Sequence, residues 1–415
     1  MNRLDILANI EVPRELEKLY RDNKPAFKTE FNLLYPELKN NKLAEYWHER
    51  LNYENSEISW GSKAEITFVI VASLIAGLIA KFPAIFNLND ENFYMRNAGF
   101  IIFPILTAYF TWKNGLSINK IAISVTVFLI GLIFIQLFPA NVKSDTLILS
   151  CIHLPLFLWA VLGFSYVGND IKDHSKRLDF LRYNGDLVIM TTLILIAGGI
   201  LTAITVGLFS IIGFHIERFY FQYFGIAGLA ASPIVGTYIT QSNPQLVNKV
   251  SPVIAKIFSP LVLLTLIVYL VAMFFSGKNP YNDREFLMVF NFLLIGVIAI
   301  ILFSVAETNR NNENRAGNFI LLALSIVTVV VNIIALSAIL IRISAWGITP
   351  NRLAVLGANI LMLTNLCMVT FRLFKNTVKK GSLGEVENSI SKFLPVYIVW
   401  VIIVTFIFPL VFQFR

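Results

Sequence analysis

Residues 252–276 read PVIAKIFSPLVLLTLIVYLVAMFFS, and Lys256 is the single charged residue among them. A helix needs about 20 mostly apolar residues, each rising ~1.5 Å, to cross a hydrocarbon core about 30 Å thick. One run of this length is also compatible with a buried core helix. The chain, however, holds roughly eleven such runs in series between Ile66 and Phe414. The series predicts an all-α fold, a polytopic membrane helix bundle with about 11 spanning helices.

The composition agrees with this prediction. Hydrophobic residues make up 56% of the chain and charged residues only 14%, whereas soluble domains average about 25% charged residues. Residues 63–415 are therefore expected to form a transmembrane helical domain. The predicted spans are residues 66–86, 97–112, 120–139, 146–167, 187–213, 224–241, 252–275, 286–306, 317–341, 352–374 and 393–413.

Residues 1–62 are polar and charged, and Pro13, Pro25 and Pro36 divide them into short pieces. They lack the apolar core and cleavage site of a signal peptide, so we expect a retained, cytoplasmic helical cap. Mixed three- and four-residue spacing predicts short amphipathic helices in this cap. Their apolar face is expected to comprise Leu33, Leu34, Leu38, Leu43 and Trp47. The favoured interpretation is a cap that lies on the membrane domain; the alternative is a docking unit for a soluble partner.

The basic residues predict the orientation in the membrane. The formal net charge is +8, and Lys and Arg collect in cytoplasmic connections beside anionic lipid. With the amino terminus inside, those connections hold the excess, including Lys113, Lys120, Lys176, Arg177, Arg182, Lys375 and Lys392. Membrane lipids are the expected partners. No basic stripe with interleaved aromatic residues is present, which argues against nucleic acid as a partner.

Three stretches resemble a known family. They are RLDFLRYNGDLVIMTTLILIAGGILTAITVGLF at 177–209, SPVIAKIFSPLVLLTLIVYL at 251–270 and ISAWGITPNRLAVL at 343–356. They are similar to a family of bacterial multi-pass membrane proteins called "domain of unknown function four-one-five-three". The resemblance implies a multi-pass topology in a bacterial inner membrane, and it brings no activity, substrate or cofactor.

Small residues recur at four-residue intervals in the fifth and sixth predicted spans. They are Gly199, Ala203 and Gly207, followed by Gly228, Ser232 and Gly236. In lipid, such stripes let helix backbones approach closely. Tight helix packing is the favoured interpretation, and the thin wall of a narrow solute path is the alternative.

Lys256 and Pro260 are candidates for an ion or substrate path. Pro260 removes a backbone donor and clashes with the carbonyl of Lys256, one turn earlier. Transporters build sites in the middle of the membrane from broken helices of this kind. The alternative is that the long Lys256 side chain extends to the cytoplasmic interface, which we slightly favour.

Uncharged polar residues inside the spans are further path candidates. Asn291, Asn332, Asn359 and Asn365 lie in predicted spans eight to ten, and an amide in hydrocarbon must face protein or water. Interhelical hydrogen bonding is the default interpretation. His153 is a lone histidine in an apolar run, and we expect a packing residue rather than a proton relay.

On the predicted outer face, Arg342 and Arg352 flank the turn WGITPN at 346–351. Thr349 is expected to cap the next helix, with Pro350 at its first position. The two arginines are interpreted either as supports of the turn, through the acidic segment 281–285, or as a clamp on an anionic group.

No catalytic constellation, metal-ligand spacing, nucleotide fingerprint or cofactor motif is present. The leading hypothesis is therefore a transporter or channel for an ion or small solute. The alternatives are a membrane enzyme acting on a lipid-linked or envelope substrate, with Arg342 and Arg352 in its site, and a membrane-anchored signalling or assembly component. A second copy of the chain and a soluble protein at the cap are open as partners.

Overall fold

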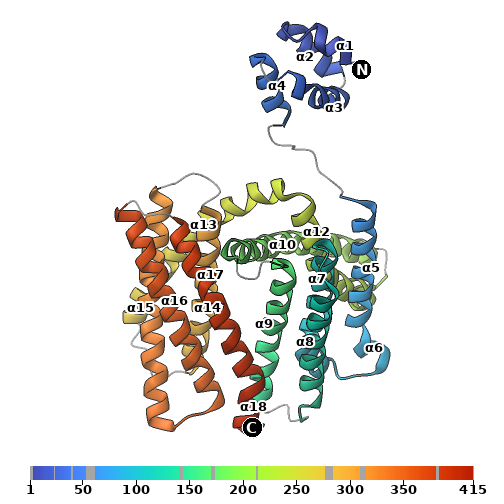
Figure 1. Ribbon diagram of the computed structural model, residues 1–415. Helices are drawn as coiled ribbons and strands as arrows, with labels where there is room; N and C mark the ends of the chain where they lie inside the picture. The colour runs from blue at the N-terminus through green and yellow to red at the C-terminus, as the bar shows by residue number, and fades with distance from the viewer. Residues whose placement is uncertain are drawn as a thin grey trace. The chain divides into compact units, whose positions relative to one another are not determined.

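The computed structural model describes residues 3–22, 24–38, 41–52, 61–139, 144–169, 173–211, 214–275, 284–308, 315–379 and 383–414. These residues form helices joined by turns, and they contain no strand, so the predicted all-α fold is confirmed (Figure 1). The chain divides into two compact units, Met1–Ser59 and Trp60–Arg415. The expected boundary, between residues 62 and 63, lies close to this division.

The first unit, Met1–Ser59, is a small helical unit with its own core. Its helices are α1 (Arg3–Ala8), α2 (Pro13–Asp22), α3 (Lys24–Leu34), a 3₁₀ turn (Tyr35–Glu37) and α4 (Lys42–Asn52). Trp47 of α4 is buried against Phe27 of α3, with ring centroids 5.2 Å apart. Leu34 is also buried, but Leu33 is 53% exposed and does not belong to the apolar face expected for it.

An ion-pair cluster joins α2 to α4 within the first unit. The Glu17 carboxylate accepts a hydrogen bond from Arg21 Nε at 2.9 Å, and its other oxygen lies 2.9 Å from Arg50 Nη1. The hydrogen bond from Arg21, aided by Arg50 and opposed by desolvation, lowers the pKa of Glu17 below 4.5. When folding lowers the pKa of a carboxyl group, the ionised group stabilises the fold at any pH above its unfolded-state pKa. This stabilisation is lost as the pH falls through the folded-state pKa.

We therefore expect Glu17→Gln to lower the unfolding temperature of the fragment 1–59 at pH 7, and to have no effect well below pH 4.5. Trp47 is the only tryptophan in that fragment, so its fluorescence reports unfolding. Glu45→Gln is the matched control, because Glu45 is exposed and forms no ion pair among the described residues. Equal pH profiles for the two variants would contradict the role given to Glu17.

The second unit, Trp60–Arg415, contains the apolar helices. They are α5 (Lys63–Ala80), α6 (Phe82–Phe86), α7 (Asp90–Lys113), α8 (Ile118–Leu137), α9 (Asp145–Val167), α10 (His174–Ile211), α11 (Glu217–Tyr220), α12 (Ile226–Ser242), α13 (Pro244–Phe275), α14 (Arg284–Thr308), α15 (Arg315–Trp346), α16 (Pro350–Lys379), α17 (Leu383–Ile402) and α18 (Phe408–Val411). Two π-helical turns, Phe221–Gly225 and Ile403–Ile407, lead into α12 and α18.

Each predicted span falls on these helices. Among the described residues, eight helices are long and apolar enough to cross a membrane, and Lys256–Val271 and Leu293–Val305 are shorter apolar helices. These helices are consistent with an integral, multi-pass membrane protein. The total of about eleven spans stays a prediction.

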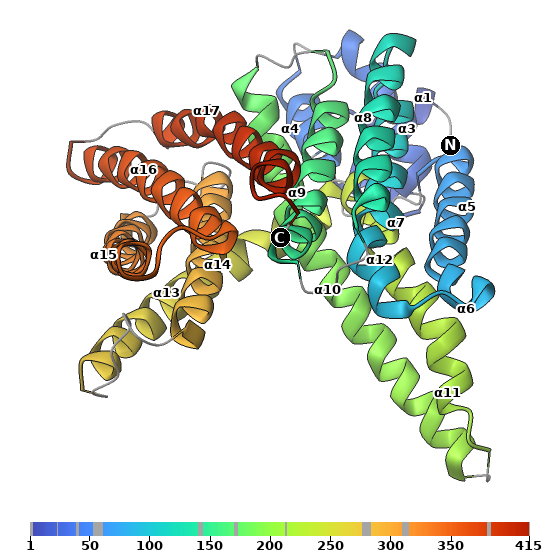
Figure 2. The same ribbon diagram turned by 90° about the horizontal axis from the view of Figure 1, so that it is seen from below.

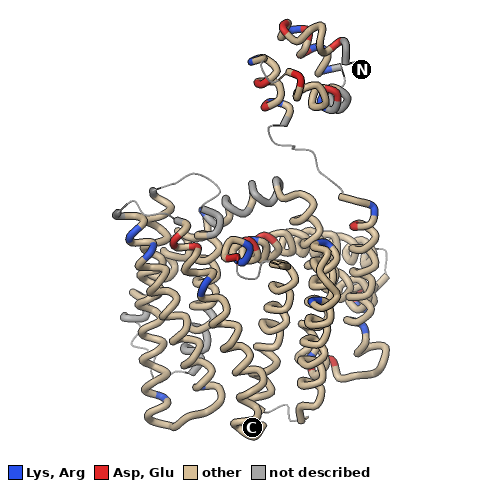
Figure 3. Tube along the Cα trace, viewed as in Figure 1, with Lys and Arg blue, Asp and Glu red and all other residues tan. Residues whose placement is uncertain are grey.

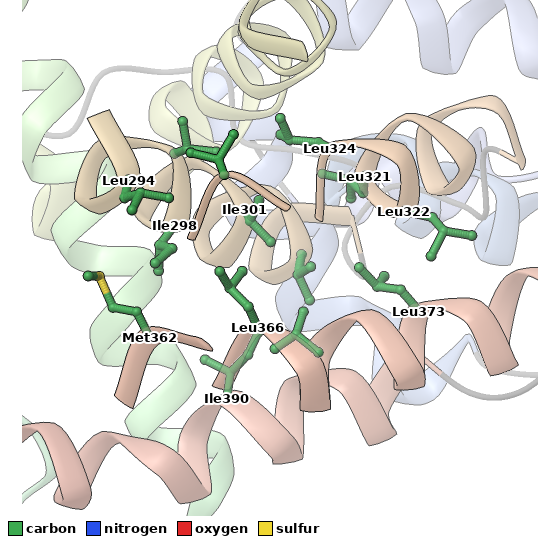
Figure 4. Close-up of a cluster of buried hydrophobic side chains, with 14 of the residues drawn as sticks. Leu294, Ile298, Ile301, Leu321, Leu322, Leu324, Met362, Leu366, Leu373 and Ile390 are labelled. Carbon is green, nitrogen blue, oxygen red and sulfur yellow. The ribbon is translucent and has the colours of Figure 1, made fainter. Parts of the chain in front are cut away.

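The helices of the second unit pack around two main cores. In Figure 2, α13 to α17 lie on one side and α5, α7, α8 and α12 on the other, with α9 between them. The core of the first group joins α14, α15, α16 and α17 through side chains that point toward one another (Figure 4). They include Leu294, Ile298, Ile301, Leu321, Leu324, Met362, Leu366, Leu373 and Ile390.

Charged residues gather at one end of the second unit, where α5 begins (Figure 3). We call this the charged end. Here Lys120 Nζ donates to the carbonyl of Gly168 at 2.7 Å, joining the start of α8 to the end of α9. Arg182 of α10 lies 2.9 Å from Glu387 of α17 and joins α10 to the group α13 to α17. The end predicted to be cytoplasmic is therefore held by hydrogen bonds and ion pairs between helices.

Candidate functional site

Lys256 lies on α13, which continues as a helix through Pro260. The Lys256 side chain is exposed and Pro260 is half-buried. The neighbouring Ser259 is buried and shares a hydrogen bond with Ser304 of α14, with the two hydroxyl oxygens 2.9 Å apart. Lys256 is therefore exposed, unlike the buried polar residues of the same group of helices. This exposure fits the interpretation in which its side chain extends to the cytoplasmic membrane interface.

His153 is held by its own helix. Its Nδ1 lies 2.9 Å from the carbonyl oxygen of Leu149, one turn earlier in α9. A carbonyl oxygen only accepts, so Nδ1 carries a hydrogen and Nε2 is left as an acceptor. The histidine belongs to α9 and is not joined by any described hydrogen bond to the amides of α14 to α16.

The predicted small-residue stripes meet other helices at only some positions. Gly199, Gly207 and Gly228 are exposed, and a Cβ added to any of them meets no described atom within 4 Å. In Figure 2 the second half of α10 projects from the rest of the second unit, with α11 beside it, and the glycines of its stripe face no other helix closely. Gly236 does lie at a tight contact, because a Cβ there would come within 2.7 Å of Thr191 Oγ1 on α10. Ser232 is buried and donates to the carbonyl of its own helix.

Asn359 and Asn291 are two of the predicted amides, and the structure brings them together. Asn359 of α16 donates from Nδ2 to Asn291 Oδ1 of α14 at 2.7 Å, and to the carbonyl of Val355 at 2.8 Å. Because the Val355 carbonyl only accepts, the atom that faces it must be the amide nitrogen. The Asn359 Oδ1 atom is buried and has no hydrogen-bond partner among the described residues.

Asn365 repeats this arrangement two turns further along α16. It is buried, and its Nδ2 donates to the Tyr397 hydroxyl of α17 at 3.0 Å. Its Oδ1 has no partner among the described residues. The Trp400 Nε1–H, on the next turn of α17, is also buried without a described acceptor. The donors of the two asparagines are therefore occupied, while their acceptor oxygens are left over.

Asn332 of α15 is the most isolated member of the set. Its side chain is 0% exposed, and neither Nδ2 nor Oδ1 has a hydrogen-bond partner among the described residues. At ~1.5 Å per residue, Asn332 lies about 21 Å from the turn that joins α15 to α16, and Asn365 lies about as far along α16. The two amides are therefore at about the same depth in the bundle. We call Asn291, Asn332, Asn359 and Asn365 the amide row.

The amide row carries no formal charge. Carboxamides offer hydrogen-bond donors and acceptors, and their oxygens also suit cations that prefer oxygen ligands. Leaving one such group unsatisfied in a protein interior costs roughly 1–3 kcal/mol, so water or a polar solute is the natural partner. The amide row can therefore bind and pass a hydrated ion or a polar solute. Its four asparagines include no nucleophile or general base.

Arg342 and Arg352 both lie at the α15–α16 turn. Arg352 donates from Nη1 to the carbonyls of Trp346 and Gly347, at 2.9 and 2.8 Å. The two guanidinium carbons lie 5.8 and 5.7 Å from the centre of the Trp346 ring, within the range of cation–π attraction. The predicted cap is confirmed, since α16 begins at Pro350 and the Arg352 amide donates to Thr349 Oγ1 at 3.3 Å.

The turn therefore uses Arg352 as a structural support, which fits the first of the two interpretations of the arginines. Of the acidic segment 281–285 proposed to pair with the arginines, residues 281–283 lie outside the described residues. The described residues of this turn add no nucleophile or general base to the two arginines of the membrane-enzyme alternative.

Sequence reasoning missed Tyr397 and Trp400. Both lie in an apolar run with no sequence neighbour that marks them, and the hydrogen bond from Asn365 to Tyr397 spans 32 residues. Aromatic rings suit a lipid-facing position as well as a position between helices, so the residue type alone did not distinguish these two environments.

No protein-family model, curated protein or solved structure matches this chain. The resemblance to the four-one-five-three family is therefore a proposal, and the candidate site depends on the geometry of the amide row alone.

Proposed function

We propose that this protein passes an ion or a small polar solute across a bacterial inner membrane, along the amide row of α14 to α16. Its long apolar helices are consistent with an integral membrane protein. Polar residues within such helices are costly, and they often mark the route of a solute or ion.

Asn332 is the observation that carries this proposal. It is fully buried and both of its polar atoms lack a partner among the described residues. A residue retained only as interhelical glue is expected to form a hydrogen bond to another helix, as Asn359 and Asn365 do. An amide that forms none is better explained by a mobile partner, either water or the transported species.

The proposed orientation places the charged end and the first unit on the cytoplasmic side. Charged residues gather where α5 begins (Figure 3). Lys113 ends α7 and pairs with Glu65 in the first turn of α5, and Lys120 lies in the first turn of α8. Basic residues concentrate in cytoplasmic connections, which supports this orientation.

Flux through proteoliposomes tests the proposal. The probes are K⁺ and Na⁺, followed with a membrane-potential dye, and glycerol and urea, followed by light scattering. We expect the wild-type protein to pass at least one probe faster than empty liposomes, and Asn332→Leu to slow that flux at least about tenfold, because the polar lining is interrupted. Wild-type rates equal to those of empty liposomes for all four probes, or unchanged flux in the variant, would refute the proposal.

The same substitution is expected to stabilise the fold. Asn332→Leu removes an unsatisfied buried amide, which costs roughly 1–3 kcal/mol, so the thermal unfolding temperature in detergent should rise or stay constant. Asn359→Leu is the matched control. It breaks the hydrogen bond to Asn291 and is expected to lower the unfolding temperature. A loss of stability in Asn332→Leu as large as in Asn359→Leu would identify Asn332 as a structural residue.

A signalling or assembly component is the second candidate, because the first unit has a core of its own. A soluble partner bound by that unit should be lost when residues 1–59 are deleted, while flux through the second unit continues. Loss of flux in the deletion variant would assign the first unit to transport instead.

A further inference from the structure

A groove of about 580 Å³ runs between α5 and α7, on the side of the second unit away from the amide row. Its lining is almost wholly apolar. Ala64 and Ala72 of α5 and Ala108 of α7 leave the space open, because their side chains are short. Phe68 and Trp112 stack with ring centroids 5.6 Å apart and form its wall beside the charged end.

The groove starts at the charged end, in the first turn of α5 and the last turn of α7. Lys63 adjoins the lining residue Ala64 and is exposed. Lys113 adjoins Trp112 and donates to Glu65 Oε1 at 3.1 Å, so one carboxylate offsets one of the two lysines. The remaining positive charge, on Lys63, lies in the first turn of α5, where the helix dipole favours an anion although Ser62 Oγ already accepts from the Glu65 amide.

We propose that this groove binds an anionic phospholipid, with one acyl chain between α5 and α7 and the phosphate beside Lys63. An acyl chain matches the narrow apolar lining, and the groove opens to the outside of the bundle rather than into it. The cationic end lies where the lipid headgroup belongs if the charged end is at the membrane surface. The groove and the amide row share no residue, so this site and the proposed transport activity can each fail without the other.

Photo-crosslinking of the full-length protein in nanodiscs tests the site. The probe is phosphatidylglycerol with a diazirine on one acyl chain, and the labelled residues are located by mass spectrometry. We expect the label to concentrate at the residues that line the groove. Ala108→Leu fills the groove from an exposed position, and it should reduce this labelling at least about fivefold. Ala203→Leu makes the same change at an exposed position on α10, and it should leave the labelling unchanged.

Two further measurements keep the test decisive if Ala108→Leu does not fold. Unlabelled phosphatidylglycerol should compete the label out of the groove in the wild-type protein. Phosphatidylcholine with the same diazirine should label the groove at least about threefold less, and Lys63→Gln should abolish that difference. Label spread evenly over the exposed residues of other spans, equal labelling by the two lipids, or cross-links from the groove to a second copy of the chain would each overturn the proposal.

Discussion

Arg182→Met should destabilise the second unit by roughly 3–5 kcal/mol, measured as a lower thermal unfolding temperature in detergent. Arg182 and Glu387 form an ion pair between α10 and α17, with the two atoms 2.9 Å apart and each side chain only 12% exposed. A buried ion pair adds little net stability, because both charges lose their hydration. Removing Arg182 is far more costly, since the Glu387 carboxylate then loses the guanidinium 2.9 Å away while its side chain stays largely out of water.

The double variant distinguishes this mechanism from a general loss of packing. Glu387→Met alone should destabilise the protein less, because Arg182 keeps its ion pair with Asp179, 2.8 Å away. Arg182→Met with Glu387→Met should recover most of the loss, because the carboxylate of α17 is removed and the one left, Asp179, is 43% exposed and stays hydrated. Arg372→Met is the surface control, since both Arg372 and Glu385 are more than 40% exposed and such pairs contribute little. The interpretation fails if Arg182→Met behaves like Arg372→Met, or if the double variant is less stable than both single variants.

Gly357→Ala should destabilise the α16–α17 contact by roughly 1–3 kcal/mol, the usual cost of forcing an extra carbon into a packed interior. A Cβ at Gly357 would overlap the indole ring of Trp400 on α17. The indole is large and rigid, and it also packs edge-on against Phe408, so moving it aside disturbs that contact as well. The Asn365–Tyr397 hydrogen bond joins the same two helices and should weaken with them.

Gly207→Ala is the control for this prediction. Gly207 is exposed on α10 and has no described neighbour, so alanine should leave stability unchanged or raise it by up to about 1 kcal/mol through its better helix propensity. Trp400→Leu should relieve the effect of Gly357→Ala, because the smaller side chain leaves room for the added methyl group. Equal unfolding temperatures for Gly357→Ala and Gly207→Ala would show that the contact between α16 and α17 adapts.

The small residues show where sequence reasoning stopped. The four-residue spacing of Gly199, Ala203 and Gly207 predicted a packing face, but a Cβ added at Gly199 or Gly207 meets no described atom within 4 Å. Gly185 and Gly357 lie in no such stripe, yet an added Cβ would overlap Phe303 and Trp400, respectively. A close helix contact depends on which aromatic ring the other helix presents, and one helix does not contain that information.

The amides show the same limit. The sequence placed Asn291, Asn332, Asn359 and Asn365 inside apolar helices, and the structure agrees. It did not indicate that Asn359 bonds to Asn291, a partner 68 residues away, or that Asn332 bonds to no described residue. These differences decide which asparagine is a structural link and which is a candidate for a solute path.

Properties that depend on residues close together in the chain could be predicted from the sequence alone. They are the helical fold, the membrane-length apolar runs and the Thr349–Pro350 start of α16. Each depends on hydrogen bonds, capping and hydrophobicity within about one helix. The Arg182–Glu387 tie, the Gly357–Trp400 contact and the unpartnered Asn332 came only from the tertiary structure. In a bundle of uniformly apolar helices, many pairings bury similar surfaces, so the choice among them depends on side chains far apart in the chain.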